Sequence, residues 1–221
     1  MKVVLAVVHK ELVLQWRTRA QLVAVLVFGV TSLLLFSFAV GPDTSVLREH
    51  APGFLWLALL LASTLSMAES LHLETENAAL EGQLLLGVPQ PALFYGKALA
   101  NWLQLALVAF LLIPEMVVLY DAAIPRPASL AVVVLLGTAG LAAPGTLYAA
   151  MTAQARAKQM LLPLLLFPLV VPVLLAAVKA ASLTMLGDPM DQLRPWLALL
   201  VAFDVIHWAL GGLFFEKVVE D

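Results

Sequence analysis

Residues 71–97, LHLETENAALEGQLLLGVPQPALFYGK, decide how the rest of this chain of 221 residues is arranged. They form a long loop with no basic residue before its last position and with three carboxylates: Glu74, Glu76 and Glu81. The whole chain is 62% hydrophobic and only 12% charged, with a mean hydropathy of +0.99. A soluble domain is about 45–50% apolar and about 25% charged. The composition therefore indicates an integral membrane protein, with this loop between two of its spans.

Read as a helix, the loop is amphipathic. Its apolar stripe consists of Leu73, Leu80 and Leu84. Glu74 and Glu81 lie on a different face, and Gly87 and Pro89 end the helix. Such a helix suits docking into a partner's groove, and the alternative is a helix resting at the lipid interface. Because helices on an anionic inner leaflet usually carry Lys and Arg, the acidic face favours a basic protein partner.

The chain contains no cysteine. Disulfides, thiolate catalysis, iron–sulfur clusters, cysteine zinc sites and covalent haem attachment are therefore excluded. No polar stretch is long enough to fold as a soluble domain, so we expect a single membrane domain over residues 1–221.

Residues 1–19 are predicted to form a basic amphipathic helix on the membrane surface rather than a signal peptide, because charges interrupt the apolar run and no small-residue cleavage site precedes them. One face carries Val4, Leu5, Val8, Leu12 and Trp16. The opposite face carries Lys2, His9, Lys10 and Arg17. This pattern is typical of an interfacial elbow helix that precedes a first span on an anionic surface.

Six segments are long and apolar enough to cross about 30 Å of hydrocarbon. They are predicted over residues 20–40, 51–68, 94–113, 128–150, 160–178 and 195–215. Pro52 is expected near the start of the second helix and Pro114 at the end of the third. Pro144 predicts a kink in the fourth. Three prolines in the fifth fit a moving gate and a fixed kink equally well. Residues 179–194 are expected to be a loop with a short helix or a re-entrant dip.

The fold class is therefore all-α, and the distribution of Lys and Arg sets its orientation. Eight lie on one side of the predicted spans: Lys2, Lys10, Arg17, Arg19, Lys97, Arg156, Lys158 and Lys217. Four lie on the other: Arg48, Arg126, Lys179 and Arg194. Both termini, the 71–97 loop and the shorter 151–159 loop are thus predicted to be cytoplasmic.

No nucleotide-binding motif is present. A P-loop needs two glycines five positions apart, followed directly by Lys and then Ser or Thr, because the lysine must reach the phosphates. Gly82 and Gly87 are followed by valine, and Gly140 and Gly145 by threonine. If the protein takes part in energised transport, the ATPase is a separate chain.

Four polar residues fall inside predicted spans: Asn101, Gln104, Asp204 and His207. Asp204 and His207 are three residues apart on one face. Burying them is costly, so they indicate either a proton or ligand site or a bond that holds helices together, and the absence of further relay residues favours the second. Asn101 and Gln104 are predicted to form interhelical hydrogen bonds.

The four histidines do not cluster along the predicted topology: His9, His50, His72 and His207. A metal site is therefore not expected. His50 lies in an outer loop near Trp56, where an exposed imidazole is able to ligate haem iron, but a solvated loop residue is the simpler interpretation.

The central loop also resembles a known family. The pattern Glu76, Leu80-Glu81, Leu84-Leu85-Leu86, Pro89 and Gly96-Lys97 is similar to that of type-2 ABC transporter permeases, and most of all to the haem exporter protein B family of cytochrome c maturation. APGFLW at 51–56 and KALANW at 97–102 fit the same family. The family often has glycine where this chain has Ala79, and Gly82 is not typical. Both departures bear on the shape of the loop helix.

The resemblance implies a non-catalytic permease subunit of the bacterial inner membrane that binds no cofactor itself. Its partners would be a cytoplasmic ATPase (haem exporter A), a haem-handling membrane protein (haem exporter C), a small single-span subunit, a periplasmic haem chaperone and membrane lipid. ATP hydrolysis on the partner would release the haem-loaded chaperone. The expected ATPase contacts are Leu73, Glu74, Glu76, Leu80, Glu81, Leu84 and Leu85, with a second contact at Arg156 and Lys158.

Three other functions are consistent with parts of the sequence. A type-2 permease that exports a lipid, drug or glycan would need a polar path between its spans. A secondary transporter would carry buried ionisable residues in several spans and inverted repeats, and the chain offers one such pair and no clear repeat. An intramembrane enzyme would need a nucleophile and a base, for which no plausible set exists.

Overall fold

The structure is a computed structural model that describes residues 2–17, 19–76, 88–152 and 158–220. These residues form seven helices and no strand: α1 (Lys2–Arg17), α2 (Arg19–Val40), α3 (Thr44–Glu76), α5 (Gln90–Tyr120), α6 (Pro127–Thr152), α7 (Lys158–Leu186) and α8 (Leu193–Glu220). The six from α2 onward are long and apolar enough to cross a membrane. The predicted all-α fold with six spans is confirmed.

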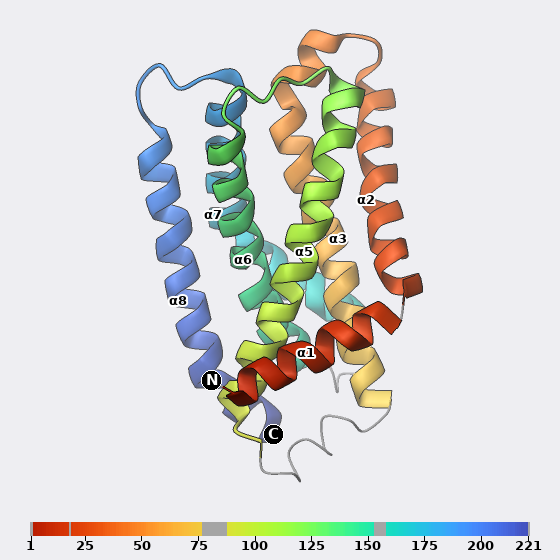
Figure 1. Ribbon diagram of the computed structural model, residues 1–221, viewed down its shortest axis with the longest axis vertical. Helices are drawn as coiled ribbons and strands as arrows, with labels where there is room; N and C mark the ends of the chain where they lie inside the picture. The colour runs from red at the N-terminus through yellow and green to blue at the C-terminus, as the bar shows by residue number, and fades with distance from the viewer. Residues whose placement is uncertain (1, 18, 77–87, 153–157, 221) are drawn as a thin grey trace.

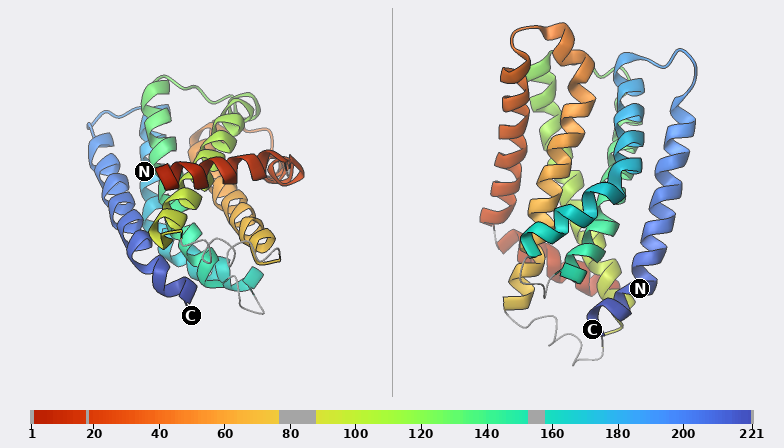
Figure 2. Two further views of the ribbon diagram at one scale, coloured as in Figure 1. Left: turned by 60° about the horizontal axis from the view of Figure 1, so that its bottom comes forward. Right: turned by 180° about the vertical axis from the view of Figure 1, so that it is seen from behind.

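Six helices stand roughly side by side, and α1 lies across them near one end (Figure 1). Both termini lie at that end, together with the end of α3 and the start of α5. The connections α2–α3, α5–α6 and α7–α8 lie at the opposite end (Figures 1 and 2). Helix α6 packs against α3, α5, α7 and α8, whereas α1 packs chiefly against α5.

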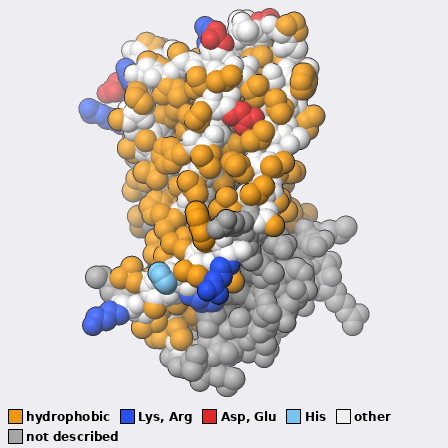
Figure 3. Space-filling view, turned by 45° about the vertical axis from the view of Figure 1, so that its right-hand side comes forward, with side chains coloured by type: hydrophobic (Ala, Val, Ile, Leu, Met, Phe, Trp, Pro, Cys, Tyr) orange, Lys and Arg blue, Asp and Glu red, His pale blue; other side chains and the backbone are white. Residues whose placement is uncertain are grey.

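On the face of the bundle drawn in Figure 3, apolar side chains cover most of the described surface, and basic side chains with a histidine gather towards its lower end. This pattern suits a protein whose sides face hydrocarbon, because charged groups are costly there.

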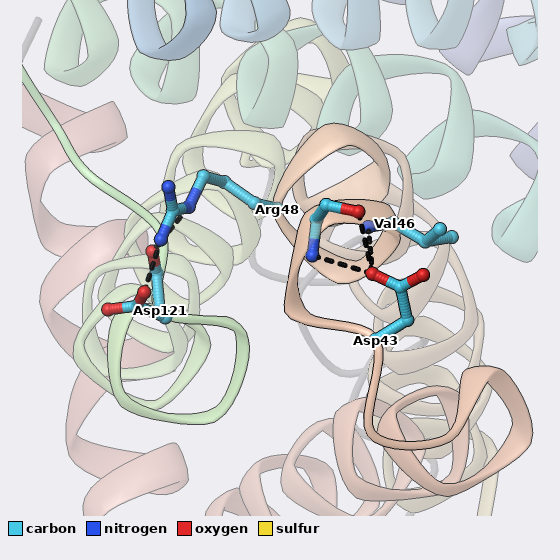
Figure 4. Close-up of polar contacts among 5 residues, drawn as sticks. Asp43, Val46, Arg48 and Asp121 are labelled. Atoms are coloured by element: carbon cyan, nitrogen blue, oxygen red, sulfur yellow. Dashed lines mark hydrogen bonds and ion pairs between the residues drawn. The ribbon is translucent and has the colours of Figure 1, made fainter.

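Helix α3 begins at Thr44, earlier than predicted, because Asp43 caps it. The Asp43 carboxylate accepts hydrogen bonds from the hydroxyl and backbone N–H of Ser45, at 2.6 and 3.0 Å, and a longer one from the N–H of Val46 (Figure 4). The bond from the Ser45 hydroxyl, and then those from the two N–H groups, lower the pKa of Asp43. Pro52 therefore lies inside the helix, and its expected place at the helix start is wrong.

Helix α5 runs to Tyr120, so the predicted end at Pro114 is also wrong. The helix ends instead where Asp121 adopts a left-handed conformation and its N–H bonds to the Val117 carbonyl. Arg48 of α3 then holds this end by an ion pair with the Asp121 carboxylate and a 2.8 Å hydrogen bond to its carbonyl (Figure 4). These contacts lie at the end of the bundle opposite the termini.

Helix α7 is continuous through its three prolines, and it changes direction along its length (Figure 2). The predicted bend is present. The helix continues through Lys179 to Leu186, and only residues 187–192 connect it to α8. The loop predicted over residues 179–194, with a short helix or a re-entrant dip, is therefore wrong for most of its length, because α7 and α8 occupy all of it except residues 187–192.

Helix α3 also extends further than predicted at its other end. Residues 71–76 continue it without interruption, because the segment contains no Gly or Pro and is rich in helix-forming Leu and Glu. Its 33 residues span roughly 50 Å, well beyond the hydrocarbon thickness of about 30 Å. Residues 77–87, where we expected the rest of a separate loop helix, lie outside the described residues.

The core is held together by large side chains that meet glycine on a neighbouring helix. Trp56 of α3 is 1% exposed, and its indole ring lies directly against Gly137 of α6, so that a Cβ at that position would overlap the ring. Only glycine permits this approach, as is common where membrane helices pack closely.

We predict that Gly137→Ala destabilises the protein by about 1–3 kcal/mol, because the added methyl group displaces a ring that the core encloses. Gly53→Ala is the matched control, since a Cβ there would meet nothing within 4 Å and alanine favours the helix. Thermal unfolding in detergent compares the two variants. Equal unfolding midpoints would contradict this account of the α3–α6 contact.

Candidate functional site at the base of α5

Helix α5 starts at Gln90, directly after the segment predicted to contact an ATPase. Residues 93–104 of this helix, here called the α5 base, contact three other helices. Most of them are buried, including four polar or aromatic side chains: Phe94, Lys97, Asn101 and Gln104. The α5 base is therefore the part of the bundle through which a movement of the preceding segment would pass.

The α5 base holds α1 by a close backbone approach and a buried ion pair. Val7 of α1 occupies the space that a side chain at Gly96 would need. Glu11 and Lys97 are 3% and 4% exposed, and the Lys97 Nζ atom lies 3.2 Å from the Glu11 Oε1 atom. Lys10 approaches the same oxygen at 3.0 Å. A buried charge is costly without a partner, so this pair fixes the position of α1 on α5.

An aromatic cluster joins the α5 base to α8. Phe94 is fully buried and meets Trp208 and Phe215 at ring-centroid distances of 6.5 and 5.7 Å. Tyr95 stacks on Trp208 with the rings nearly parallel. Aromatic pairs at these distances add to the stability gained from burial alone, so α8 is expected to move together with the start of α5.

Polar bonds join the α5 base to α6. The Asn101 amide donates to the Thr146 hydroxyl at 2.9 Å, and Trp102 donates to the Leu135 carbonyl at 2.9 Å. The predicted interhelical hydrogen bond of Asn101 is present. Gln104 is equally buried, but neither polar atom of its amide has a hydrogen-bond partner among the described residues, so the interhelical bond predicted for it is absent from this part of the chain.

Asp204 and His207, predicted to bond to another helix, do not pair with each other within the part of the chain that the structure describes. The His207 ring stacks on Phe203 of its own helix and bonds through Nδ1 to the Phe203 carbonyl at 2.8 Å. Asp204 is 8% exposed. Among the described residues its Oδ1 atom has no hydrogen-bond partner, and it lies beside Gly140 of α6. Neither residue therefore makes the predicted bond to another helix in this part of the chain.

The structure leaves most of the expected ATPase contacts untested. Leu80, Glu81, Leu84, Leu85 and Arg156 lie outside the described residues. Leu73, Glu74, Glu76 and Lys158 lie on helices, but their side chains are not described. Within the described residues, no three His, Asp or Glu side chains are grouped so as to hold a metal ion.

The most buried charges of the site were not predicted from the sequence. Residues 1–19 were expected to have an apolar and a basic face, whereas the face packed on the bundle is a third one: Val7, Glu11 and Gln15. The signal was available, since these residues are spaced by four and include the helix's single carboxylate. Lys97, a lysine at the start of an apolar span, was its natural partner.

The crossing α1 helix, the six spans and the tied α5 base define a multi-pass helical membrane protein. A sequence profile of the CcmB protein family matches residues 2–220. "Heme exporter protein B" of Pseudomonas aeruginosa is 33% identical over 87% of this chain and 86% of its own length. The proteins of the same name from Haemophilus influenzae and Bradyrhizobium diazoefficiens are 32% and 28% identical, over 84% and 93% of this chain and 84% and 92% of their own lengths. The chain belongs to the CcmB protein family.

We predict that Lys97→Met lowers the free energy of unfolding by about 3–5 kcal/mol, because it leaves the Glu11 carboxylate buried with less compensation. The double variant Glu11→Gln/Lys97→Met is expected to be more stable than Lys97→Met alone, since it removes both charges. Lys217→Met, an exposed position, is the control. Unfolding titrations with a denaturing detergent give the free energy of unfolding of each of the three variants. A double variant no more stable than Lys97→Met would argue against the broken ion pair as the cause of the destabilisation.

Proposed function

We propose that this chain is the non-catalytic permease subunit of an ABC transporter complex of cytochrome c maturation in the bacterial inner membrane. A separate cytoplasmic ATPase hydrolyses ATP, and the permease converts that hydrolysis into release of a haem-loaded chaperone on the opposite, periplasmic side. Membership of the CcmB family, whose matching relatives are called heme exporter protein B, is the observation that carries this proposal.

The proposed mechanism is mechanical. Helix α3 extends past its span towards the ATPase and brings Leu73, Glu74 and Glu76 with it. The segment that follows adds Leu80, Glu81, Leu84 and Leu85, which dock in a groove of the ATPase, with the glutamates facing basic residues at its rim. Arg156, between α6 and α7, and Lys158, the first residue of α7, make a second contact.

Movement of this segment then enters α5 at Gln90. Since α5 is bound to α1 by the Glu11–Lys97 pair and to α6 by the Asn101–Thr146 bond, the helices shift together rather than independently. Haem exporter C, a small single-span subunit and the chaperone complete the proposed assembly. In this proposal the ATPase binds ATP, the haem-handling partners bind haem, and this chain binds neither.

One observation favours a second candidate, export of a lipid, drug or glycan. Lys97, Asn101 and Gln104 are spaced by four and then three residues, so they lie along one stripe of α5, and the Gln104 amide has no partner among the described side chains. Such a stripe would line the start of a polar path. Stimulation of ATP hydrolysis in the reconstituted complex separates the two candidates: a haem-loaded chaperone stimulates under the first, and a lipid or drug under the second.

The orientation predicts where thiol reagents reach the chain. Because the protein has no cysteine, Glu49→Cys and Lys217→Cys each introduce a single exposed reporter, at opposite ends of the bundle. A membrane-impermeant maleimide applied from the periplasmic side should label the first and label the second only after the membrane is opened. The reverse pattern would place the proposed ATPase contacts on the wrong side.

The docking segment predicts a loss of assembly. Leu80→Asp and Glu81→Lys should abolish co-purification with the ATPase, because they remove an apolar anchor and reverse a charge at the contact. Membrane insertion should remain normal. Glu49→Lys makes the same charge change at the other end of the bundle and should leave co-purification intact. Wild-type recovery of the ATPase with both docking variants would refute the proposed contact.

A further inference from the structure

Asp204 is a buried carboxyl near the middle of a membrane span. It belongs to the span Leu193–Val218 of α8 and is 8% exposed. Its Oδ1 atom lies 2.9 Å from the place where a Cβ atom of Gly140 would stand, in the contact between α6 and α8. The same point is approached by Val173 of α7 and by Phe203. The carboxyl is therefore enclosed by apolar side chains and glycine backbone where α6, α7 and α8 meet.

The backbone that this carboxyl meets lacks its usual hydrogen bond. In a regular helix the Gly140 carbonyl would accept from the N–H of residue 144, but that residue is Pro144, which has no N–H. A carbonyl freed in this way at membrane depth needs a donor from a neighbouring helix. One residue earlier, the Ala139 carbonyl accepts a 3.3 Å bond from Trp208 of α8. Helix α8 therefore lies within hydrogen-bonding reach of this part of α6.

Among the described residues, no other titratable group completes this contact. Helices α5, α6 and α7 pack against α8, and their titratable residues are Tyr95, Lys97, Glu115, Tyr120, Tyr148, Lys158 and Lys179. Those with described side chains make no hydrogen bond to the Asp204 Oδ1 atom. On α8 itself, the His207 ring bonds to the Phe203 carbonyl instead. The other titratable residues of α8 lie ten or more positions away: Arg194, Glu216, Lys217 and Glu220.

We propose that Asp204 is a proton-binding site, at which the protonated carboxyl donates its O–H to the Gly140 carbonyl and joins α8 to α6. A carboxylate only accepts hydrogen bonds, whereas a protonated carboxyl has an O–H to donate, and an unpaired negative charge is costly at this depth. A metal cation would need several oxygen ligands, and the side chains of Val173 and Phe203 offer none. The proton is therefore the ligand that fits. This inference does not depend on the ATPase or on haem.

Loss of the proton would alter a contact between helices rather than one side chain alone. An ionised Asp204 attracts water and repels the Gly140 carbonyl, so α8 is expected to loosen from α6 and α7 at this level. Asp204 is about one helical turn from Trp208, which stacks on Tyr95 of the α5 base. Occupancy of the site by a proton therefore affects how firmly α8 is held against the α5 base.

The first test records infrared spectra of the full chain, purified in detergent, between about pH 5 and about pH 9. Ordinary Asp and Glu carboxyls lose their protons near pH 4, so the carbonyl band of a protonated carboxylic acid in this range marks a retained proton. The wild type should show the band at the acidic end and lose it as the pH rises, and Asp204→Asn should lack it. The matched control is Glu49→Gln, the same change at an exposed carboxyl, which should keep the band.

Thermal unfolding gives a second readout. The folded protein holds a proton that the unfolded chain releases above about pH 4, so its stability should fall as the pH rises. Each pH unit should lower the unfolding midpoint of the wild type, relative to Asp204→Asn, by about 3–5 °C, until the folded protein also loses the proton.

Four results would overturn the proposal. They are no band in the wild type, a band that persists in Asp204→Asn, a band that only Glu115→Gln removes, and a difference in unfolding midpoint that does not vary with pH. Stabilisation of the wild type over Asp204→Asn by sodium or potassium chloride would show a metal-cation site and would equally refute it. If Asp204→Asn does not fold, Asp204→Glu keeps a carboxyl in a changed position and should shift the band, and an unshifted band would assign the proton elsewhere.

Discussion

A carboxylate and an ammonium group that leave water together must stay together, and the pair between Glu11 and Lys97 imposes this condition where the surface helix meets the bundle. The pair fixes which face of α1 is turned inwards. Once that face is set, Leu5 and Trp16 must point away from the bundle, and the helix is left with only positive charge outside. The composition of one contact thus determines which face of α1 packs on the spans and which face is left outside.

The same contact lies on the helix that follows the proposed ATPase-binding segment. Within residues 93–104, α5 is joined to α1 by charge, to α8 by aromatic rings and to α6 by the Asn101–Thr146 bond. A helix held on three sides cannot tilt by itself. Any displacement that reaches Gln90 is therefore shared by several spans. A permease subunit driven by ATP hydrolysis on a partner chain would require this property. Within the CcmB family this arrangement gives the proposed coupling a physical route.

Much of the fold could be predicted because the bilayer dictates it: length and apolarity alone locate six spans. The ends of helices were harder, since proline is only a weak boundary signal. Asp43 caps α3 ahead of Pro52, and the bond between Arg48 and Asp121 secures α5 beyond Pro114. Partners of polar residues were harder still. Asn101 bonds to Thr146 of α6, whereas Gln104 of the same helix has no hydrogen-bond partner among the described residues. Whether such a bond forms depends on which side chain the neighbouring helix places opposite, and the sequence of one helix does not show this.

Glu11 and Lys97 are separated by 86 positions in the sequence, which has a consequence for biosynthesis. When the N-terminal helix leaves the ribosome, Lys97, the lysine that is buried beside its carboxylate in the folded protein, belongs to a helix not yet translated. The Glu11 carboxylate must therefore stay hydrated, and α1 cannot pack against α5, until the third span is inserted. Closure of this part of the molecule is a late assembly event, although it involves the first residues to be made.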